Sequence, residues 1–163
     1  MIWTRGSFVV SDEKERLKVG EIAGIMKQGY WSAHYKAETI ARLLQTSFWL
    51  GVFLKGRLIG FARVVTDKTT VTLITDFIIH EDYKGNGHGA WLMSCLLEHP
   101  DLKETSMSLG TQDADGFFEK FGFERDGALM HRAPNTPAPP PPPPLKARTK
   151  GKAGLIAKKR RED

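Results

Sequence analysis

The sequence predicts an α/β fold in which a mixed, mostly antiparallel sheet carries helices on both faces, giving three layers. Two apolar runs at residues 48–54 and 58–65 flank the turn at 55–57, which is typical of a β-hairpin. A third apolar run over 71–79 follows a polar turn and ends in a glycine-rich loop and a helical segment. These observations predict three neighbouring strands followed by a crossover helix.

The segments on either side alternate between helical and extended patterns. Apolar residues at three- to five-residue spacings predict helices, and short β-branched runs bounded by polar residues or glycine predict strands. The further elements expected are, in chain order, a strand at 7–10, helices at 17–28, 37–45 and 88–98, a strand at 105–110, a short helix at 114–120 and a strand at 128–132.

Charge divides the 163 residues into two parts. Residues 133–163 contain eight Lys or Arg and two acidic residues, a formal charge of +6, so the other residues carry −1 of the total of +5. We therefore predict a nearly neutral folded domain at 1–132 and a basic tail at 133–163.

The tail begins with a proline-rich stretch that favours extended polyproline II, and it continues as a basic segment for which we predict disorder. The run Lys158-Lys159-Arg160-Arg161 is typical of a nuclear address or of a patch for nucleic acid or acidic lipid. The prolines could dock a protein partner, and a solvated tail without any partner is the alternative.

Cysteine content and hydropathy bear on location. Cys95 is the one cysteine, and its apolar helical segment predicts a small buried side chain in a protein of a reducing compartment. No apolar run approaches the ~20 residues of a membrane span, and the first residues lack a long apolar region. We expect a soluble, cytoplasmic protein, or a nuclear one if the tail is an address.

Three glycines at alternate positions lie between the third apolar run and the following helix, in the stretch Lys84-Gly85-Asn86-Gly87-His88-Gly89-Ala90. Glycine permits positive φ and close approach, and the first amides of a helix beginning near His88 point unpaired into the loop. Together with the helix dipole they form a site for phosphate. Neither the dinucleotide fingerprint nor the P-loop has this spacing, and a flexible turn is the alternative.

The loop resembles the pyrophosphate loop of the GNAT superfamily of acetyl-CoA-dependent N-acyltransferases, whose motif is Arg/Gln-x-x-Gly-x-Gly/Ala. Lys84 stands where that motif has Arg or Gln, and its charge still suits phosphate. A second stretch, Thr111 to Phe123, is similar to the family segment Ala-x-Gly-Leu-Tyr-x-Lys-Phe-Gly-Phe. With the order of elements, the resemblance covers about residues 7–132.

This resemblance implies a GNAT-like sheet with a splayed central strand, acetyl-CoA as co-substrate and a primary amine as acceptor. In such proteins the strand backbone pairs with the pantetheine arm, and one strand amide faces the thioester carbonyl, where negative charge develops. The matching residues, expected to bind the cofactor, are Phe77, Ile78, Ile79, Lys84, Gly85, Asn86, Gly87, His88, Gly89, Ala90, Asp113, Phe117 and Phe118.

Asp76 is the predicted catalytic residue. An alkylammonium has a pKa of about 10, so an acceptor must lose a proton before its nitrogen attacks. The carboxylate directly precedes the apolar end of the strand, at a position that is acidic in many relatives. It would bind the ammonium directly or withdraw the proton through water, and a structural Asp that binds neighbouring turns is the alternative.

Phe118 departs from the family pattern, because relatives commonly place there a Tyr that protonates the CoA thiolate. A phenyl ring has no proton to give. We therefore expect positioning and polarisation to supply most of the rate, with water, Tyr83 or Ser108 as the proton source.

Aromatic residues dominate the loop between the first two helices. Tyr30, Trp31 and Tyr35 are predicted to line the acceptor pocket, although loop aromatics also anchor loops to a core.

No pair of the five histidines has metal-ligand spacing on a helix face, so we predict no metal site. A homodimer is left open.

Two functions follow. The first is an N-acetyltransferase that transfers an acetyl group from acetyl-CoA to a primary amine of a small molecule or peptide by direct attack in a ternary complex. The alternative is a non-catalytic acyl-CoA-binding module whose basic tail contacts nucleic acid or a protein partner, and the absence of Tyr at position 118 favours it.

Overall fold

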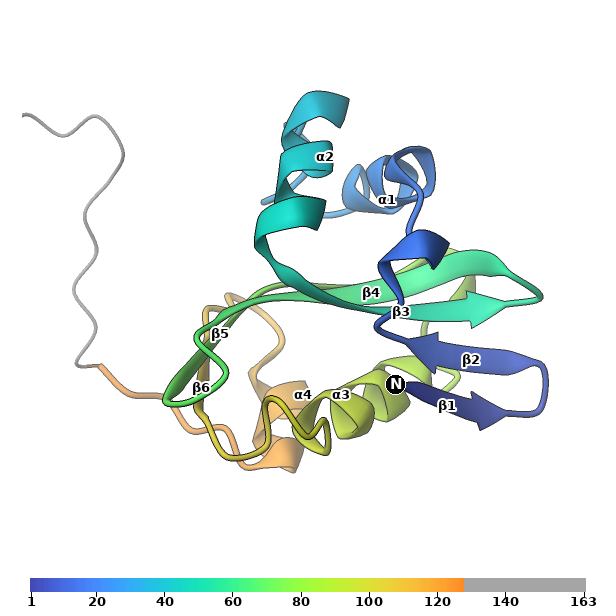
Figure 1. Ribbon diagram of the computed structural model, residues 1–163. Coiled ribbons are helices and arrows are strands. Elements are labelled where there is room, and N and C mark those ends of the chain that lie inside the picture. The colour runs from blue at the N-terminus through green and yellow to red at the C-terminus, as the bar shows by residue number, and fades with distance from the viewer. Residues whose placement is uncertain (128–163) are drawn as a thin grey trace, which may run out of the picture. The chain divides into compact units, whose positions relative to one another are not determined.

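A six-stranded sheet carries the fold of residues 1–127, the part of the chain that the computed structural model describes (Figure 1). The strands are β1 (Ile2–Arg5), β2 (Phe8–Ser11), β3 (Phe48–Leu54), β4 (Arg57–Thr66), β5 (Val71–Ile79) and β6 (Ser106–Leu109). The helices are α1 (Val19–Met26), α2 (Ala37–Thr46), α3 (His88–Leu97) and α4 (Asp115–Phe118), with short 3-10 turns at Lys14–Arg16, Glu81–Tyr83 and Glu119–Phe121.

The strands neighbour one another in chain order, from β1 to β6. Each neighbouring pair is antiparallel except β5 and β6, which are parallel. A parallel pair needs a crossover connection, and α3 supplies it. Helices α1 and α2 cover one face of the sheet, and α3 and α4 cover the other (Figure 1). The predicted three-layer α/β fold with a mostly antiparallel sheet is confirmed.

Two apolar cores lie on the two faces of the sheet. Leu92 and Leu96 of α3 pack in one, and Ile22 and Met26 of α1 pack in the other. Strand β4 contributes to both because its side chains alternate: Phe61 packs toward α1, whereas its neighbour Ala62 packs toward α3. A central strand buried on both faces explains the nearly continuous apolar runs from which the hairpin was predicted.

The structure corrects the prediction at two places in the first thirty residues. The chain begins its sheet at β1, an edge strand paired with β2, whereas the prediction began at residue 7. Ile2 and Thr4 are exposed, so this strand lacks the apolar pattern that reveals a strand. Helix α1 is shorter than the predicted 17–28. The strand predicted at 128–132 and the tail at 133–163 lie outside the described residues, so the domain boundary stays a prediction.

A β-bulge at Thr75 changes the direction of every later side chain in β5. Val64 pairs with Ile74 and Arg63 pairs with Asp76, so Thr75 is an extra residue with no residue opposite it on β4. Before the bulge, the side chain of Ile74 packs on the α3 side of the sheet. After it, Asp76 faces the α1 side, where Trp31 of the α1–α2 loop binds it.

Strands β5 and β6 separate beyond the bulge. Strand β6 pairs with β5 only as far as the pair Ile74 and Leu109. The amide of His80 donates to the Ile59 carbonyl of β4 at 2.8 Å, and backbone groups alternate along a strand. The N–H and C=O groups of Phe77 and Ile79 therefore point away from β4, into the gap. This is the predicted splay of a central strand.

Asp67 organises the turn between β4 and β5. Its Oδ1 accepts hydrogen bonds from the amides of Thr69, Thr70 and Val71 at 2.9, 2.8 and 3.0 Å. The Thr70 hydroxyl donates to its other oxygen. These bonds, with that of the Thr70 hydroxyl the strongest, hold the pKa of Asp67 well below its ordinary value of 3.8.

Asp67→Ala is expected to lower the free energy of unfolding at pH 7 by an amount that shrinks in acid. Because the folded-state pKa is lowered, the stabilisation by Asp67 is fully present above pH 3.8 and is lost as the pH falls toward the folded value. Urea unfolding of both proteins between pH 7 and pH 2 measures the difference. A difference that does not vary with pH would contradict the assignment.

Candidate active site

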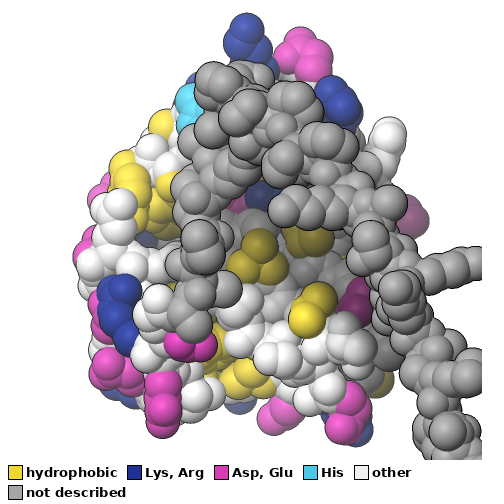
Figure 2. All heavy atoms as spheres, turned by 90° about the vertical axis from the view of Figure 1, so that its left-hand side faces the viewer, with side chains coloured by type: hydrophobic (Ala, Val, Ile, Leu, Met, Phe, Trp, Pro, Cys, Tyr) yellow, Lys and Arg dark blue, Asp and Glu magenta, His cyan; other side chains and the backbone are white. Residues whose placement is uncertain are grey.

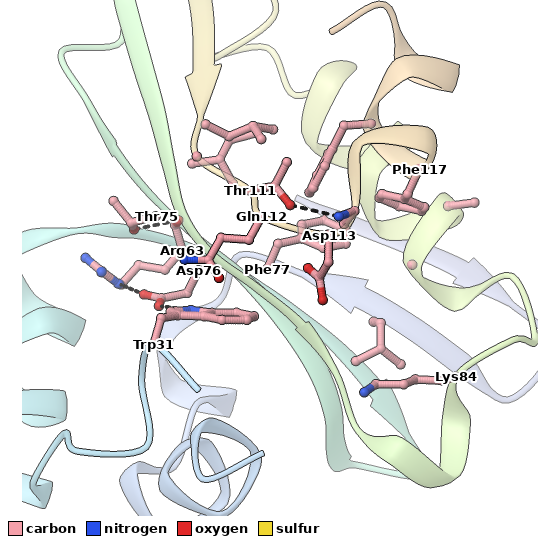
Figure 3. Close-up of a pocket in the computed structure, with 18 of the residues that line it drawn as sticks. Trp31, Arg63, Thr75, Asp76, Phe77, Lys84, Thr111, Gln112, Asp113 and Phe117 are labelled. Atoms are coloured by element: carbon pink, nitrogen blue, oxygen red, sulfur yellow. Dashed lines mark hydrogen bonds and ion pairs between the residues drawn. The ribbon is translucent and has the colours of Figure 1, made fainter. Parts of the chain in front are cut away.

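A cavity of about 1190 Å³ opens where β5 and β6 separate. Figure 2, which looks at the molecule from the left-hand side of Figure 1, shows a hollow with hydrophobic side chains inside it. Residues from both faces of the sheet line the cavity: Trp31 and Asp76 from the α1 side, and Phe77 and Phe117 from the α3 side. Figure 3 shows these groups with Lys84 at the far end from Trp31. We name the two ends the α1 half and the α3 half.

The α3 half contains most of the residues predicted to bind the cofactor. They come from the open part of β5, the glycine loop, the start of α3 and the segment around α4. Those that line the cavity are Phe77, Ile79, Lys84, Gly85, Gly87, Gly89, Ala90, Asp113, Phe117 and Phe118.

Ile78, Asn86 and His88 do not line the cavity. The Ile78 side chain packs in the α1-side core, and the alternation described above directs its backbone groups toward β4. The His88 ring packs on Phe8 of β2, with ring centroids 4.4 Å apart. The open strand edge therefore consists of Phe77 and Ile79, and any contact of His88 with a ligand falls to its backbone.

The glycine loop has the backbone geometry that an anion site requires. Gly85 and Gly87 adopt φ of 78° and 79°, a left-handed conformation that other residues rarely adopt, and Gly87 is the N-cap of α3. The first α-helical bond runs from Trp91 N–H to the Gly87 carbonyl at 3.0 Å. The preceding amides of α3 thus lack intrahelical partners and are available to a phosphate.

The α1 half carries the three loop aromatics predicted to bind the acceptor. Tyr30, Trp31 and Tyr35 all line the cavity. The Tyr30 and Trp31 rings meet edge to face with centroids 4.8 Å apart, and both side chains are exposed. The loop therefore presents aromatic surface to the cavity as well as anchoring itself.

Asp76 lies at the junction of the two halves and is only 2% exposed. Its Oδ2 accepts from Arg63 Nε at 2.5 Å, and its Oδ1 accepts from Trp31 Nε1 at 3.1 Å (Figure 3). Arg63 is buried as well, and its Nη1 donates to Ser47 Oγ at 3.3 Å. The carboxylate charge is thus balanced by a neighbour, and each oxygen has a protein donor. The catalytic role of Asp76 stays a prediction.

Sequence reasoning missed Arg63. A signal was present, because Arg63 is the one charged residue inside the apolar run 58–65, and Asp76 stands similarly alone in 71–79. Two lone opposite charges on neighbouring strands suggest a cross-strand pair. The register of β4 and β5 places them directly opposite each other.

An aromatic cluster surrounds position 118, where the resemblance would place a proton-donating Tyr. Phe118 is buried, and its ring contacts those of Phe77 and Phe117 at centroid distances of 5.9 and 5.0 Å. Of the two alternative donors, Tyr83 lines the cavity and Ser108 does not. The hydroxyl of Tyr83 is therefore the better placed of the two.

Three further expectations concern Cys95, metals and membranes. Cys95 is buried in α3, and burial, aided by the charge of Glu98, raises its pKa to about 11, so it is a core residue. Within residues 1–127, no group of three or more potential ligands could hold a metal ion. The helices described there include none that is long and apolar enough to cross a bilayer.

The fold and the cavity together define an α/β protein whose cavity joins an open strand edge and a helix N-terminus to an aromatic wall. The chain belongs to the Acetyltransferase (GNAT) family, whose model matches residues 11–123.

Relatives in sequence carry acetyltransferase names. The chain is 25% identical over 116 residues to FG08082 of Gibberella zeae, an unproven acetyltransferase, covering 59% of this chain and 66% of that protein. It is 35% identical over 74 residues to ycf52 of Porphyra purpurea, an uncharacterised N-acetyltransferase, covering 43% and 41%. The chain thus spans less than two thirds of the length of either relative.

Solved structures share the fold. A Xanthomonas campestris protein with an unproven assignment to the GNAT acetyltransferases superposes with a TM-score of 0.72 at 27% identity, covering 80% of this chain and 95% of that one. The aminoglycoside N-acetyltransferase AAC(6')-Iy, in complex with CoA, gives a TM-score of 0.60 at 14% identity, covering 82% and 99%.

Proposed function

We propose that the protein transfers an acetyl group from acetyl-CoA to a primary amine of a small molecule or peptide, within a ternary complex. The observation that carries this proposal is the cavity, which joins an open strand edge and a helix N-terminus on one side to an aromatic wall on the other. Bound acetyl-CoA would supply the activated acetyl thioester.

The residues of the α3 half fit this co-substrate. Phe77 and Ile79 offer backbone groups that β6 does not use, and an extended pantetheine arm can satisfy such groups as an added strand does. The amides at the start of α3 fit a diphosphate, and the nearby Lys84 supplies positive charge. The aromatic cluster around Phe117 supplies an apolar wall.

Rate enhancement would come chiefly from positioning and from polarisation of the carbonyl by a β5 amide. The acceptor amine must lose a proton before it attacks the carbonyl carbon, and the leaving sulfur must gain one. Asp76 is almost fully buried, so it would act on the acceptor proton through water rather than by direct contact. Of the two hydroxyls considered as proton donors to the sulfur, Tyr83 and Ser108, only Tyr83 lines the cavity.

Release of CoA thiol from acetyl-CoA, measured across a panel of primary amines, tests the proposal. Amine-dependent release is expected, and Tyr83→Phe should reduce it about tenfold or more at neutral pH if the hydroxyl protonates the sulfur. Thiol release that does not depend on any amine, or tight CoA binding without release, would favour the non-catalytic acyl-CoA-binding module.

A further inference from the structure

Five of the seven exposed large apolar residues in 1–127 belong to the α1–α2 loop and to strands β4 and β5: Tyr30, Trp31, Val65, Val71 and Leu73. The other two, Met1 and Ile2, lie at the start of the chain and in β1. Tyr30, Trp31 and Leu73 also line the cavity. Leu73 is 44% exposed, and it pairs across the sheet with Val65, which is 49% exposed. Exposed apolar side chains that meet inside a cavity favour an apolar ligand.

Trp31 is held in place rather than free to turn away. Its Nε1 donates to Asp76 Oδ1 at 3.1 Å, and the Tyr30 ring packs against it edge to face. Because the indole N–H is already used, the surface that the ring offers a ligand is apolar. A fixed aromatic wall of this kind binds flat or bulky apolar groups at little cost in entropy.

Charge in the α1 half is balanced within the protein. Arg63 and Asp76 are both buried and pair with each other, so neither leaves a net charge for a ligand. The other cavity carboxylate, Asp113, reaches the cavity from the opposite side, as Figure 3 shows. Lys84 and Lys120 add positive charge to the cavity wall. The α1 half therefore lacks the set of free carboxylates that a polyamine needs.

We propose that the acceptor is a monoamine whose amino group is attached to an aromatic or similarly bulky apolar group, which packs against Trp31 and Leu73. This inference rests on the proposed function and names the substrate class of the same site. The amino group would reach the junction of the two halves, while the apolar group covers the exposed wall.

A comparison of three amines tests the class. Phenethylamine is expected to exceed 1,4-diaminobutane and methylamine in kcat/KM by about tenfold or more, because only phenethylamine fills the apolar wall. Equal values, or a preference for 1,4-diaminobutane, would overturn the inference and leave the acetyltransferase proposal intact. Binding of each amine to the CoA-saturated protein, measured by calorimetry, gives the same ranking independently of turnover.

A matched pair of variants locates the wall. Leu73→Asp places an unpaired carboxylate in the cavity, so we expect the ratio of kcat/KM for phenethylamine over 1,4-diaminobutane to fall about tenfold. Val71→Asp adds the same charge two residues earlier on β5, at a side chain that is 57% exposed and does not line the cavity. The ratio should be unchanged in that control, and equal effects in both variants would count against the assigned wall.

The two proposals fail in distinguishable ways. If the protein takes up neither CoA nor acetyl-CoA, the proposed function itself is wrong. If it binds CoA but no amine turns over, the calorimetric ranking of the three amines still decides the acceptor class.

Discussion

Gly87→Val is expected to raise the Kd for CoA by about 100-fold, the largest effect on binding that the structure predicts. Gly87 caps α3 at φ 79°, where a β-branched residue is strongly disfavoured. A shift of the loop would misplace several amides at once, and each hydrogen bond to a charged group contributes about 1.5–3 kcal/mol. Titration calorimetry with CoA measures the change.

Gly89→Ala, two residues further on in the first turn of α3, is the control for Gly87→Val. A Cβ at Gly89 would lie 3.6 Å from Ile79 Cγ1 and 3.7 Å from the Phe117 ring, which are ordinary contacts, and Gly89 does not have a positive φ. We expect the Kd of this variant for CoA to stay within about threefold of the wild-type value, since no backbone strain arises. A similar weakening of CoA binding in both variants would mean that the left-handed turn at Gly87 does not position the CoA diphosphate.

Arg63→Met is expected to lower the free energy of unfolding by about 3–5 kcal/mol, because it leaves Asp76 buried without its ionic partner. The pair is among the least exposed in residues 1–127, with side-chain exposures of 7% and 1%. Urea unfolding monitored by circular dichroism measures the loss. A loss below about 1 kcal/mol, the range of surface ion pairs, would show that the pair is not buried in solution.

The double variant Arg63→Met, Asp76→Leu separates stability from chemistry. Replacing both charges by apolar side chains removes the unpaired group, so most of the lost stability should return. If Asp76 acts on the acceptor proton, amine-dependent thiol release should stay low although the protein is stable. Recovery of both stability and turnover would make Asp76 a structural residue.

The glycine loop and the strands around it could be predicted from local patterns. Residues 48–54 and 58–65 are apolar because β3 and β4 are central, and the glycines at 85 and 87 mark positive φ. Each of these signals lies within about twenty neighbouring residues. Most of the α3 half of the cavity follows from them.

The α1 half could be predicted only in part, through its three loop aromatics. The bulge at Thr75 decides that Asp76 faces Trp31, and a bulge depends on the register between two strands. The Arg63–Asp76 pair and the position of Leu73 in the cavity wall depend on the same register. Strand β1 was not predicted because an exposed edge strand has little apolar pattern in its sequence.

The single extra residue at Thr75 also decides which side of the sheet each later side chain of β5 serves. Beyond it, Asp76 projects to the α1 side and Phe77 to the α3 side. Under the proposed function, substitutions in the α1–α2 loop should therefore change which amine is acetylated without changing the affinity for CoA.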